Sequence, residues 1–274
     1  MPTLRRPRLM RYALVTVACV AALAGAALQA KAPPAAAQNK TLVVLLDRIE
    51  PEYKAGAKYR TPATIDNELA EDLARRMQMP LTRADAGQAA ASAAAGAGAV
   101  RLPLTTLADA DAVPRGHTVV PVAYHAAPMA IMRTDTDITS WDQLRGRTVC
   151  VARGSRHAGM AAGRYGATEM AFASVTDAMI AVRSGACDAV VDDSAMLREL
   201  VRLPEWKKFS AQLTAAHSST LAFVVPASDT DSVAQARKIA AAWKAEAYPD
   251  AVVKKAAQNI AFEVYLEQDV ADCH

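Results

Sequence analysis

Polar and charged residues that could bind a small ionic molecule follow three predicted strands in the sequence, at residues 42–46, 148–152 and 188–191. In chain order they are Asp47, Gly154, Ser155, Arg156 and Asp193. A carboxylate accepts hydrogen bonds from an ammonium group, whereas free amides at a helix N-terminus bind an anion. Open α/β sheets bind ligands at the carboxyl ends of their strands, so these residues are candidates for ligand binding.

Motifs for catalysis or metal binding are absent from the sequence. The histidines are scattered, at positions 117, 125, 157, 217 and 274. There is no His-Glu-x-x-His, no Gly-x-Ser-x-Gly and no Gly-x-x-x-x-Gly-Lys-Ser/Thr, so neither a zinc protease, a serine hydrolase nor a nucleotide site is indicated. Ser155 and His157 are too close in sequence to be identified as a nucleophile and its base. We therefore expect a non-enzyme with no catalytic residue, no metal site and no cofactor.

Strands and helices alternate along the chain, which predicts an α/β fold with mainly parallel sheets. Residues 42–46 are continuously apolar, as in a strand buried on both faces. Residues 64–77 carry apolar side chains at four-residue steps and predict an amphipathic helix. Gly154 and Ser155 are expected to begin a helix after the strand at 148–152, and residues 232–248 predict the last helix.

The first 37 residues are typical of a secretory signal peptide. Four arginines precede an uncharged apolar run at residues 13–28, and small residues ending at Ala37 suit signal peptidase. The run is shorter than the roughly 20 apolar residues that span a bilayer, which disfavours a membrane anchor. We expect cleavage near Ala37 and a product in the periplasm.

Composition is that of a globular chain, because 52% of the 274 residues are hydrophobic and 22% are charged. The length allows two modest domains. The segment after residue 37 contains 26 basic and 28 acidic residues. This balance does not support a nucleic-acid-binding surface.

Three cysteines remain after the predicted cleavage, at positions 150, 187 and 273, and they allow three alternative single disulfides. Cys150 lies in an apolar run and is expected to be a buried strand residue. We expect the pair Cys187 and Cys273, because this bridge would hold the C-terminal tail.

Two segments carry a resemblance to a known family. Residues 138–149, ITSWDQLRGRTV, are similar to the pattern s-x-x-D-L-x-G-k-x-V, with Gly154-Ser155 following as G-[ST]. Residues 183–193, RSGACDAVVDD, are similar to L-x-x-G-x-x-D-A-x-x-x-D. These patterns belong to the periplasmic solute-binding proteins of ABC transporters, of the amino-acid-binding family 3. In the first part of the chain, residues 64–69, TIDNEL, resemble the family's G-F-D-v-D-L, but Thr64 and Ile65 replace its glycine and phenylalanine.

The resemblance implies a two-lobe periplasmic-binding-protein fold of type II, in which each lobe is a mainly parallel sheet flanked by helices. Residues 38–133 and 226–274 are expected to form the first lobe, and residues 134–225 the second. The connecting strands would cross near residues 132–135 and near residues 225–226.

The resemblance also implies a ligand site between the lobes. Arg115 stands where the family has the arginine of T-x-E-R, which binds the ligand carboxylate. A guanidinium suits this role because it can donate to both carboxylate oxygens at once. Gly154 and the backbone amides of Ser155 and Arg156 would assist it, Asp193 would bind the ligand ammonium, and Asp47 would contact its distal group.

The function implied by the resemblance is capture of an amino acid or carboxylate by a monomer that delivers it to an ABC membrane permease. Two alternatives remain open. The missing motifs of the first lobe favour a degenerate pocket in an interaction partner or sensor. Some relatives of the fold are periplasmic dehydratases, in which Asp193 would act as a general base.

Overall fold

A computed structural model describes residues 40–47, 60, 65–85, 99–107, 113–214 and 219–267. All of them belong to one compact unit, Gln38–His274. The predicted signal peptide at residues 1–37 and the residue Cys273 lie outside the described residues. Within these ranges no helix is both long and apolar enough to cross a membrane.

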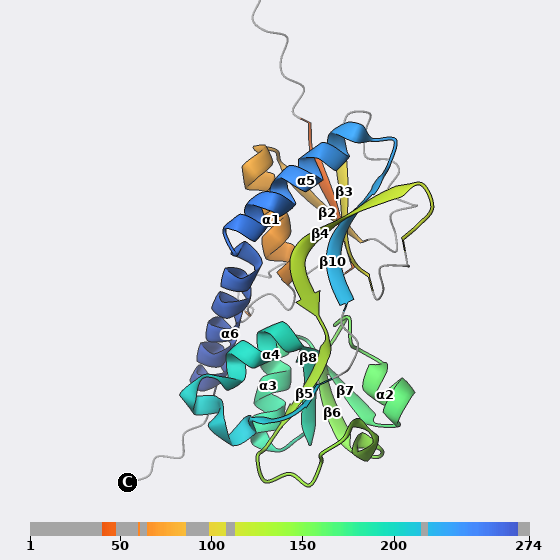
Figure 1. Cartoon of the computed structure of the whole chain (residues 1–274). Coiled ribbons are helices and arrows are strands. Elements are labelled where there is room, and N and C mark those ends of the chain that lie inside the picture. The colour runs from red at the N-terminus through yellow and green to blue at the C-terminus, as the bar shows by residue number, and fades with distance from the viewer. Residues whose placement is uncertain are drawn as a thin grey trace, which may run out of the picture. The chain divides into compact units, whose positions relative to one another are not determined.

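The first sheet contains five strands in the order β2-β1-β3-β10-β4. Their bounds are β1 Leu42–Leu46, β2 Leu81–Asp85, β3 Val100–Leu107, β4 His117–Ala126 and β10 Ser219–Pro226. β1 runs parallel to β2 and β3, whereas β10 runs antiparallel to β3 and β4. Helix α1, Ile65–Met77, packs on β1 and β2, and helix α5, Thr230–Ala245, packs on β4, β10 and β3 (Figure 1).

The second sheet also has five strands, in the order β7-β6-β8-β5-β9. They are β5 Pro128–Met132, β6 Thr148–Ala152, β7 Thr168–Phe172, β8 Ala189–Asp193 and β9 Ala211–Thr214. β6 is parallel to β7 and β8, and β5 is antiparallel to β8 and β9. The helices of this lobe are α2 Met160–Tyr165, α3 Val175–Ser184 and α4 Ser194–Val201, with 3₁₀ turns at Trp141–Leu144 and Pro204–Phe209.

The chain changes sheet at Ala127, between β4 and β5, and returns between β9 and β10. Both crossings precede the boundaries predicted at residues 133/134 and 225/226, so β5 lies in the second lobe and β10 in the first. The physical reason is that β5 is buried by pairing with β8 and β9, while β10 completes the first sheet between β3 and β4.

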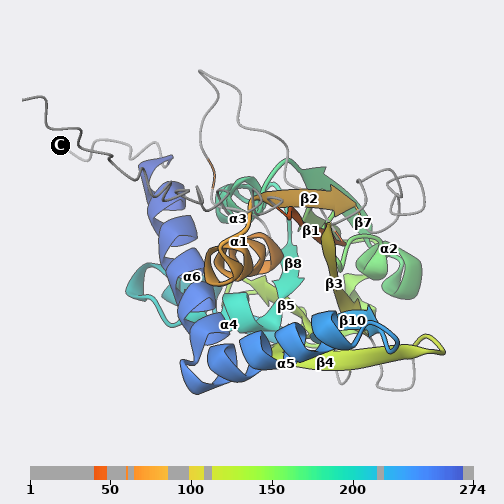
Figure 2. The same ribbon diagram turned by 90° about the horizontal axis from the view of Figure 1, so that it is seen from above.

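Helix α6, Tyr248–Leu266, contacts elements of both lobes: α1 and α5 of the first, and α3 and α4 of the second. Figure 2 shows it beside α1 and α4. The predicted helix at 232–248 is confirmed as α5 with slightly earlier bounds, but α6 was missed by the sequence analysis. Ala247, with a left-handed φ of 49°, separates the two helices.

The two lobes share one apolar core. It joins residues such as Leu69 and Trp243 of the first lobe to Val190 and Trp206 of the second. Leu69 is fully buried, and truncation of such a leucine to alanine typically costs about 2–5 kcal/mol of stability. Residues on the other face of the second sheet form a separate, smaller core.

A disulfide joins Cys150 in β6 to Cys187, just before β8, with their Cα atoms 5.8 Å apart. The expected bridge from Cys187 to Cys273 is therefore wrong, because a cysteine forms only one disulfide. Its correct partner follows from the topology: β6 and β8 are adjacent parallel strands, with Cys150 opposite Val190. The expectation that Cys150 is a buried strand residue is confirmed.

Candidate functional site

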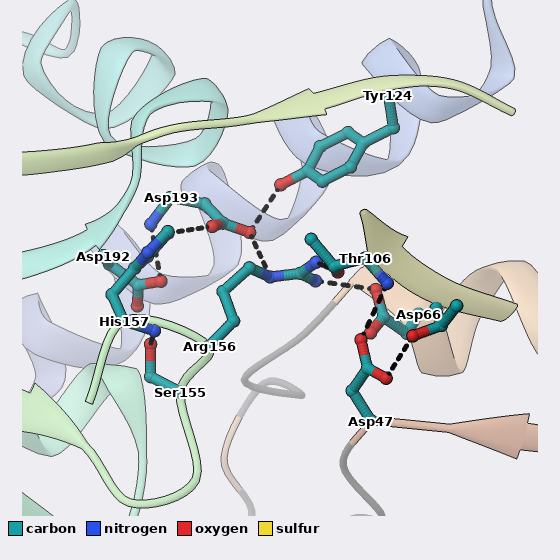
Figure 3. Close-up of polar contacts among 10 residues, drawn as sticks. Asp47, Asp66, Thr106, Tyr124, Ser155, Arg156, His157, Asp192 and Asp193 are labelled. Carbon is teal, nitrogen blue, oxygen red and sulfur yellow. Dashed lines mark hydrogen bonds and ion pairs between the residues drawn. The ribbon is translucent and has the colours of Figure 1, made fainter. Parts of the chain in front are cut away.

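Asp193 is the centre of a buried polar cluster between the two lobes (Figure 3). It is the last residue of β8, and only 7% of its surface is exposed. One carboxylate oxygen accepts a hydrogen bond from the Tyr124 hydroxyl at 2.8 Å and lies 3.3 Å from Nε of Arg156. The other oxygen lies 2.5 Å from Nε2 of His157. Asp193 is also the N-cap residue of α4, but its side chain makes no capping hydrogen bond and contacts the cluster instead.

Arg156 connects Asp193 to the first lobe. Its Nη2 donates to Asp66 at 2.9 Å, and its Nη1 donates to the Thr106 hydroxyl. Its side chain is 11% exposed. Asp66 lies in the first turn of α1, where the helix dipole favours an acidic residue, and Thr106 lies in β3. One guanidinium therefore contacts carboxylates of both lobes.

Asp47 positions the β3 side of the cluster. It directly follows β1, and its carboxylate accepts hydrogen bonds from the Thr105 hydroxyl at 2.6 Å and from the backbone N–H of Thr106 at 2.9 Å. Asp47 itself is exposed. These bonds fix Thr106, which in turn faces Arg156 (Figure 3).

The acidic groups of the cluster differ in their pKa values because their surroundings differ. Burial alone would raise the pKa of Asp193, but Arg156, His157 and Tyr124 hold it below the usual range. The pKa of Asp66 is raised, because its burial outweighs the attraction of Arg156. Burial and the neighbouring Asp193 raise the pKa of Asp192 to about 6. Asp193 is thus the carboxylate best suited to hold a positive charge.

Two other groups of the cluster are also shifted. Burial, reinforced by the charge of Asp193, raises the pKa of Tyr124 well above its usual value, so Tyr124 remains a hydroxyl donor. Burial alone would lower the pKa of Arg156, but Asp66 and Asp193 raise it. Arg156 is therefore permanently cationic, and its charge is balanced by two acids of the protein.

Asp47, Arg156 and Asp193 are the predicted site residues that the structure brings together. Gly154 lies in the preceding turn with φ of 72°, where a side chain would strain the backbone. Ser155 accepts a long hydrogen bond at Oγ from the backbone N–H of His157, at 3.3 Å. Its own N–H donates to the carbonyl of Ala152 at 2.9 Å, so this amide is already engaged.

The helix expected to begin at Ser155 begins instead at Met160. The intervening residues form consecutive turns, in which Ala158 donates to Ser155 and Met160 donates to His157. Gly159, at φ of 83°, ends this turn segment. No helix N-terminus therefore faces the cluster at Ser155.

Arg115 does not share the cluster. It is exposed in the turn before β4, where Pro114 accepts a hydrogen bond from the backbone of His117. Tyr124 is nine positions further along, and at about 3.3 Å per strand residue this separation is roughly 30 Å. Arg115 therefore does not lie beside Asp193 as expected, because the extended strand β4 separates Arg115 from Tyr124, which contacts Asp193.

Asp66, Thr106, Tyr124 and His157 contribute to the cluster but were not predicted from the sequence as site residues. Asp66 had a signal, because it matches the first aspartate of the family pattern at residues 64–69. His157 was considered only as a base beside Ser155. Among the described residues, no group of three or more His, Cys, Asp or Glu side chains is arranged to hold a metal.

Two five-stranded sheets, each flanked by helices, form a two-lobe α/β fold, and the likeness to solved binding-protein structures confirms the predicted fold. No protein-family model and no curated protein sequence matches the chain. Solved structures do match.

A mutant of ArgBP from T. maritima is 22% identical, covering 79% of this chain and 94% of its own, with a TM-score of 0.51. The amino acid ABC transporter substrate-binding protein AbpA from Streptococcus pneumoniae, bound to L-arginine, is 16% identical, covering 81% and 96%, with a TM-score of 0.52. The GluR0 ligand-binding core in complex with L-glutamate is 15% identical, covering 80% and 98%, with a TM-score of 0.50. At these identities the likeness shows the shared fold.

Proposed function

We propose that the protein is an extracytoplasmic solute-binding protein that captures a small ligand between its lobes and presents it to an ABC membrane permease. The observation that carries this proposal is the meeting of polar and charged side chains from both lobes, Asp66 and Thr106 with Arg156 and Asp193, at one buried site. The signal-peptide pattern of residues 1–37 supports a location in the periplasm.

The charges of the cluster favour a ligand that carries a positive group. Among the described residues of the cluster, the aspartates Asp66 and Asp193 are paired with Arg156, and Asp47 lies beside them on the Thr105 and Thr106 side. A ligand ammonium would find carboxylate acceptors here, whereas a ligand carboxylate would have to compete for Arg156. An amino acid therefore fits better than a simple carboxylate. The structural neighbours named above include complexes with L-arginine and L-glutamate.

Transport would use the two crossings between the lobes as a hinge. A ligand that contacts groups on both lobes binds the closed arrangement more tightly than the open one, and this difference shifts the equilibrium toward closure. The permease would recognise the closed form, and the protein would act as a monomer. No covalent step is needed.

A melting-temperature screen of the full set of L-amino acids and a series of small carboxylates tests this function. A ligand that binds only the folded state raises the melting temperature by mass action. We expect a rise with at least one amino acid, its loss in Asp193→Asn, and its retention in Arg115→Ala, which alters an exposed arginine outside the cluster. A folded sample that responds to no compound at millimolar concentration would contradict solute binding.

The second candidate function is that of an interaction partner or sensor with a degenerate pocket. The specific observation that favours it is Arg156, whose guanidinium lies between the acids that would otherwise contact a ligand. Absence of any response in the same screen would support this alternative. A dehydratase is not favoured, because the low pKa of Asp193 makes its carboxylate a weak base.

A further inference from the structure

We propose that the junction of the two lobes is a guanidinium-binding site whose occupant is the chain's own Arg156. All three nitrogens of this side chain are engaged, each with a different residue: Nε with Asp193, Nη2 with Asp66 and Nη1 with Thr106. A planar guanidinium with its fixed fork of N–H donors suits such a set of acceptors.

Asp193 and Thr106 are held in place by contacts that do not involve Arg156, and Asp66 is held by its place in a helix. Asp193 is bound by the Tyr124 hydroxyl and by His157, on its two different oxygens. The backbone of Thr106 is bound by Asp47. Asp66 lies in the first turn of α1 and is 1% exposed. Removal of the arginine side chain therefore leaves a preorganised site rather than a collapsed one.

The same geometry makes Arg156 an internal connection between the lobes. Asp66 and Thr106 belong to the first lobe, and Arg156 and Asp193 belong to the second. A tethered cation is always present at its own site, so this contact between the lobes needs no added solute. For the same reason an external guanidinium compound cannot enter the wild-type site without displacing Arg156.

A cavity-rescue experiment tests this inference with methylguanidinium as the probe. Arg156→Ala should melt about 6 °C or more below the wild type, because two buried carboxylates lose their partner. Millimolar methylguanidinium chloride should raise the melting temperature of this variant in a saturable manner. N-methylurea, a neutral molecule of similar shape, and sodium chloride at equal ionic strength should not. The wild type should show no saturable rise.

A second variant checks where the probe binds. In Asp66→Asn/Arg156→Ala the saturable rise should be much reduced, because one of the two carboxylates is neutral. Folded Arg156→Ala that does not respond to methylguanidinium would overturn the inference, as would an equal response in the double variant. If Arg156→Ala does not fold, methylguanidinium but not N-methylurea should restore its refolding yield, and failure to do so would also overturn it.

The inference does not depend on the proposed transport function. A wild type that binds an amino acid while Arg156→Ala ignores methylguanidinium would leave solute binding in place and remove the guanidinium site. Rescue of Arg156→Ala by methylguanidinium in a protein that binds no amino acid would support the guanidinium site and remove solute binding. The two proposals can therefore fail separately.

Discussion

Arg156 donates a hydrogen bond to Asp66 at 2.9 Å across 90 positions of sequence, and this bond joins the second lobe to the first helix of the first lobe. Both side chains are largely buried, at 11% and 2% exposure. Removal of one partner from a buried ion pair leaves an uncompensated charge, whereas removal of both does not. Replacement of the two residues should therefore be strongly non-additive.

The first prediction is a double-mutant cycle between these residues. Arg156→Ala should lower the free energy of unfolding by about 3–5 kcal/mol, because Asp66 and Asp193 stay buried without their cation. Asp66→Asn should cost less, since Asn needs no counter-charge and Arg156 keeps Asp193. The loss of unfolding free energy in the double variant should be smaller than the sum of the two single losses, by about 1 kcal/mol or more. Urea unfolding followed by circular dichroism measures all three.

The control for this cycle is Arg115→Ala, because Arg115 is an exposed arginine away from the cluster. It should change stability by no more than about 0.5 kcal/mol. Strict additivity of Arg156→Ala and Asp66→Asn would show that the pair does not couple the lobes.

The second prediction concerns the pH dependence of stability. Burial raises the pKa of Asp192 to about 6, above the usual value of 3.8. Between these two values the folded state binds more protons than the unfolded state, so this group's contribution is fully present below the unfolded pKa and is lost as the pH rises through about 6. Asp193, whose pKa is lowered, acts in the opposite sense only at lower pH.

Comparison of the wild type with Asp192→Asn isolates this contribution. The Asn carbonyl oxygen can still accept the backbone N–H of Asp193, which Asp192 now binds at 2.7 Å. From about pH 7 to about pH 5, the wild type should gain about 1 kcal/mol relative to the variant. Parallel urea curves at each pH measure the difference. A difference that stays constant over this interval would refute the assigned protonation of Asp192.

The third prediction concerns the disulfide. Cys150 and Cys187 are 37 positions apart, and closure of a loop of this length restricts the unfolded chain by about 4 kcal/mol in the chain-entropy model. Dithiothreitol should therefore lower the urea midpoint of the wild type. Cys150→Ala/Cys187→Ala should be less stable at the outset and should not respond to dithiothreitol. A wild type that is fully reduced, as shown by mass after alkylation, yet unfolds at the same midpoint would contradict this role.

The strand-end residues of the site could be predicted from the sequence because each follows an apolar run that marks a buried strand. Asp47 and Asp193 were found in this way. Asp66 and Tyr124 were not, because their contacts with Arg156 and Asp193 span 90 and 69 positions and depend on how the two lobes meet. Arg115 was placed by resemblance of motif order, which carries no information about the direction in which β4 runs.

The crossing between the two sheets and the disulfide pairing leave no local signal in the sequence, for similar reasons. A single residue, Ala127, separates β4 from β5, so the apolar pattern continues through the crossing without a signal. The pairing of Cys150 with Cys187 requires β6 to lie next to β8. Strand order of this kind is set by long-range packing, and the local pattern of one strand does not contain it.

The last prediction concerns Tyr124, the second contact between the lobes at Asp193. Its hydroxyl, on β4, donates to the Asp193 carboxylate at 2.8 Å, and the residue is 4% exposed. Tyr124→Phe should cost about 1.5–3 kcal/mol, because it removes a hydrogen bond to a buried charge and creates almost no cavity. Tyr265→Phe, which changes a tyrosine that is 61% exposed, should leave stability within about 0.5 kcal/mol of the wild type.

Because the Tyr124 bond also lowers the pKa of Asp193, the acid limb of the stability profile should move to higher pH in Tyr124→Phe. Urea unfolding between neutral and acidic pH measures both effects, and equal behaviour of the two tyrosine variants would show that the Tyr124 hydroxyl does not bind Asp193 in solution.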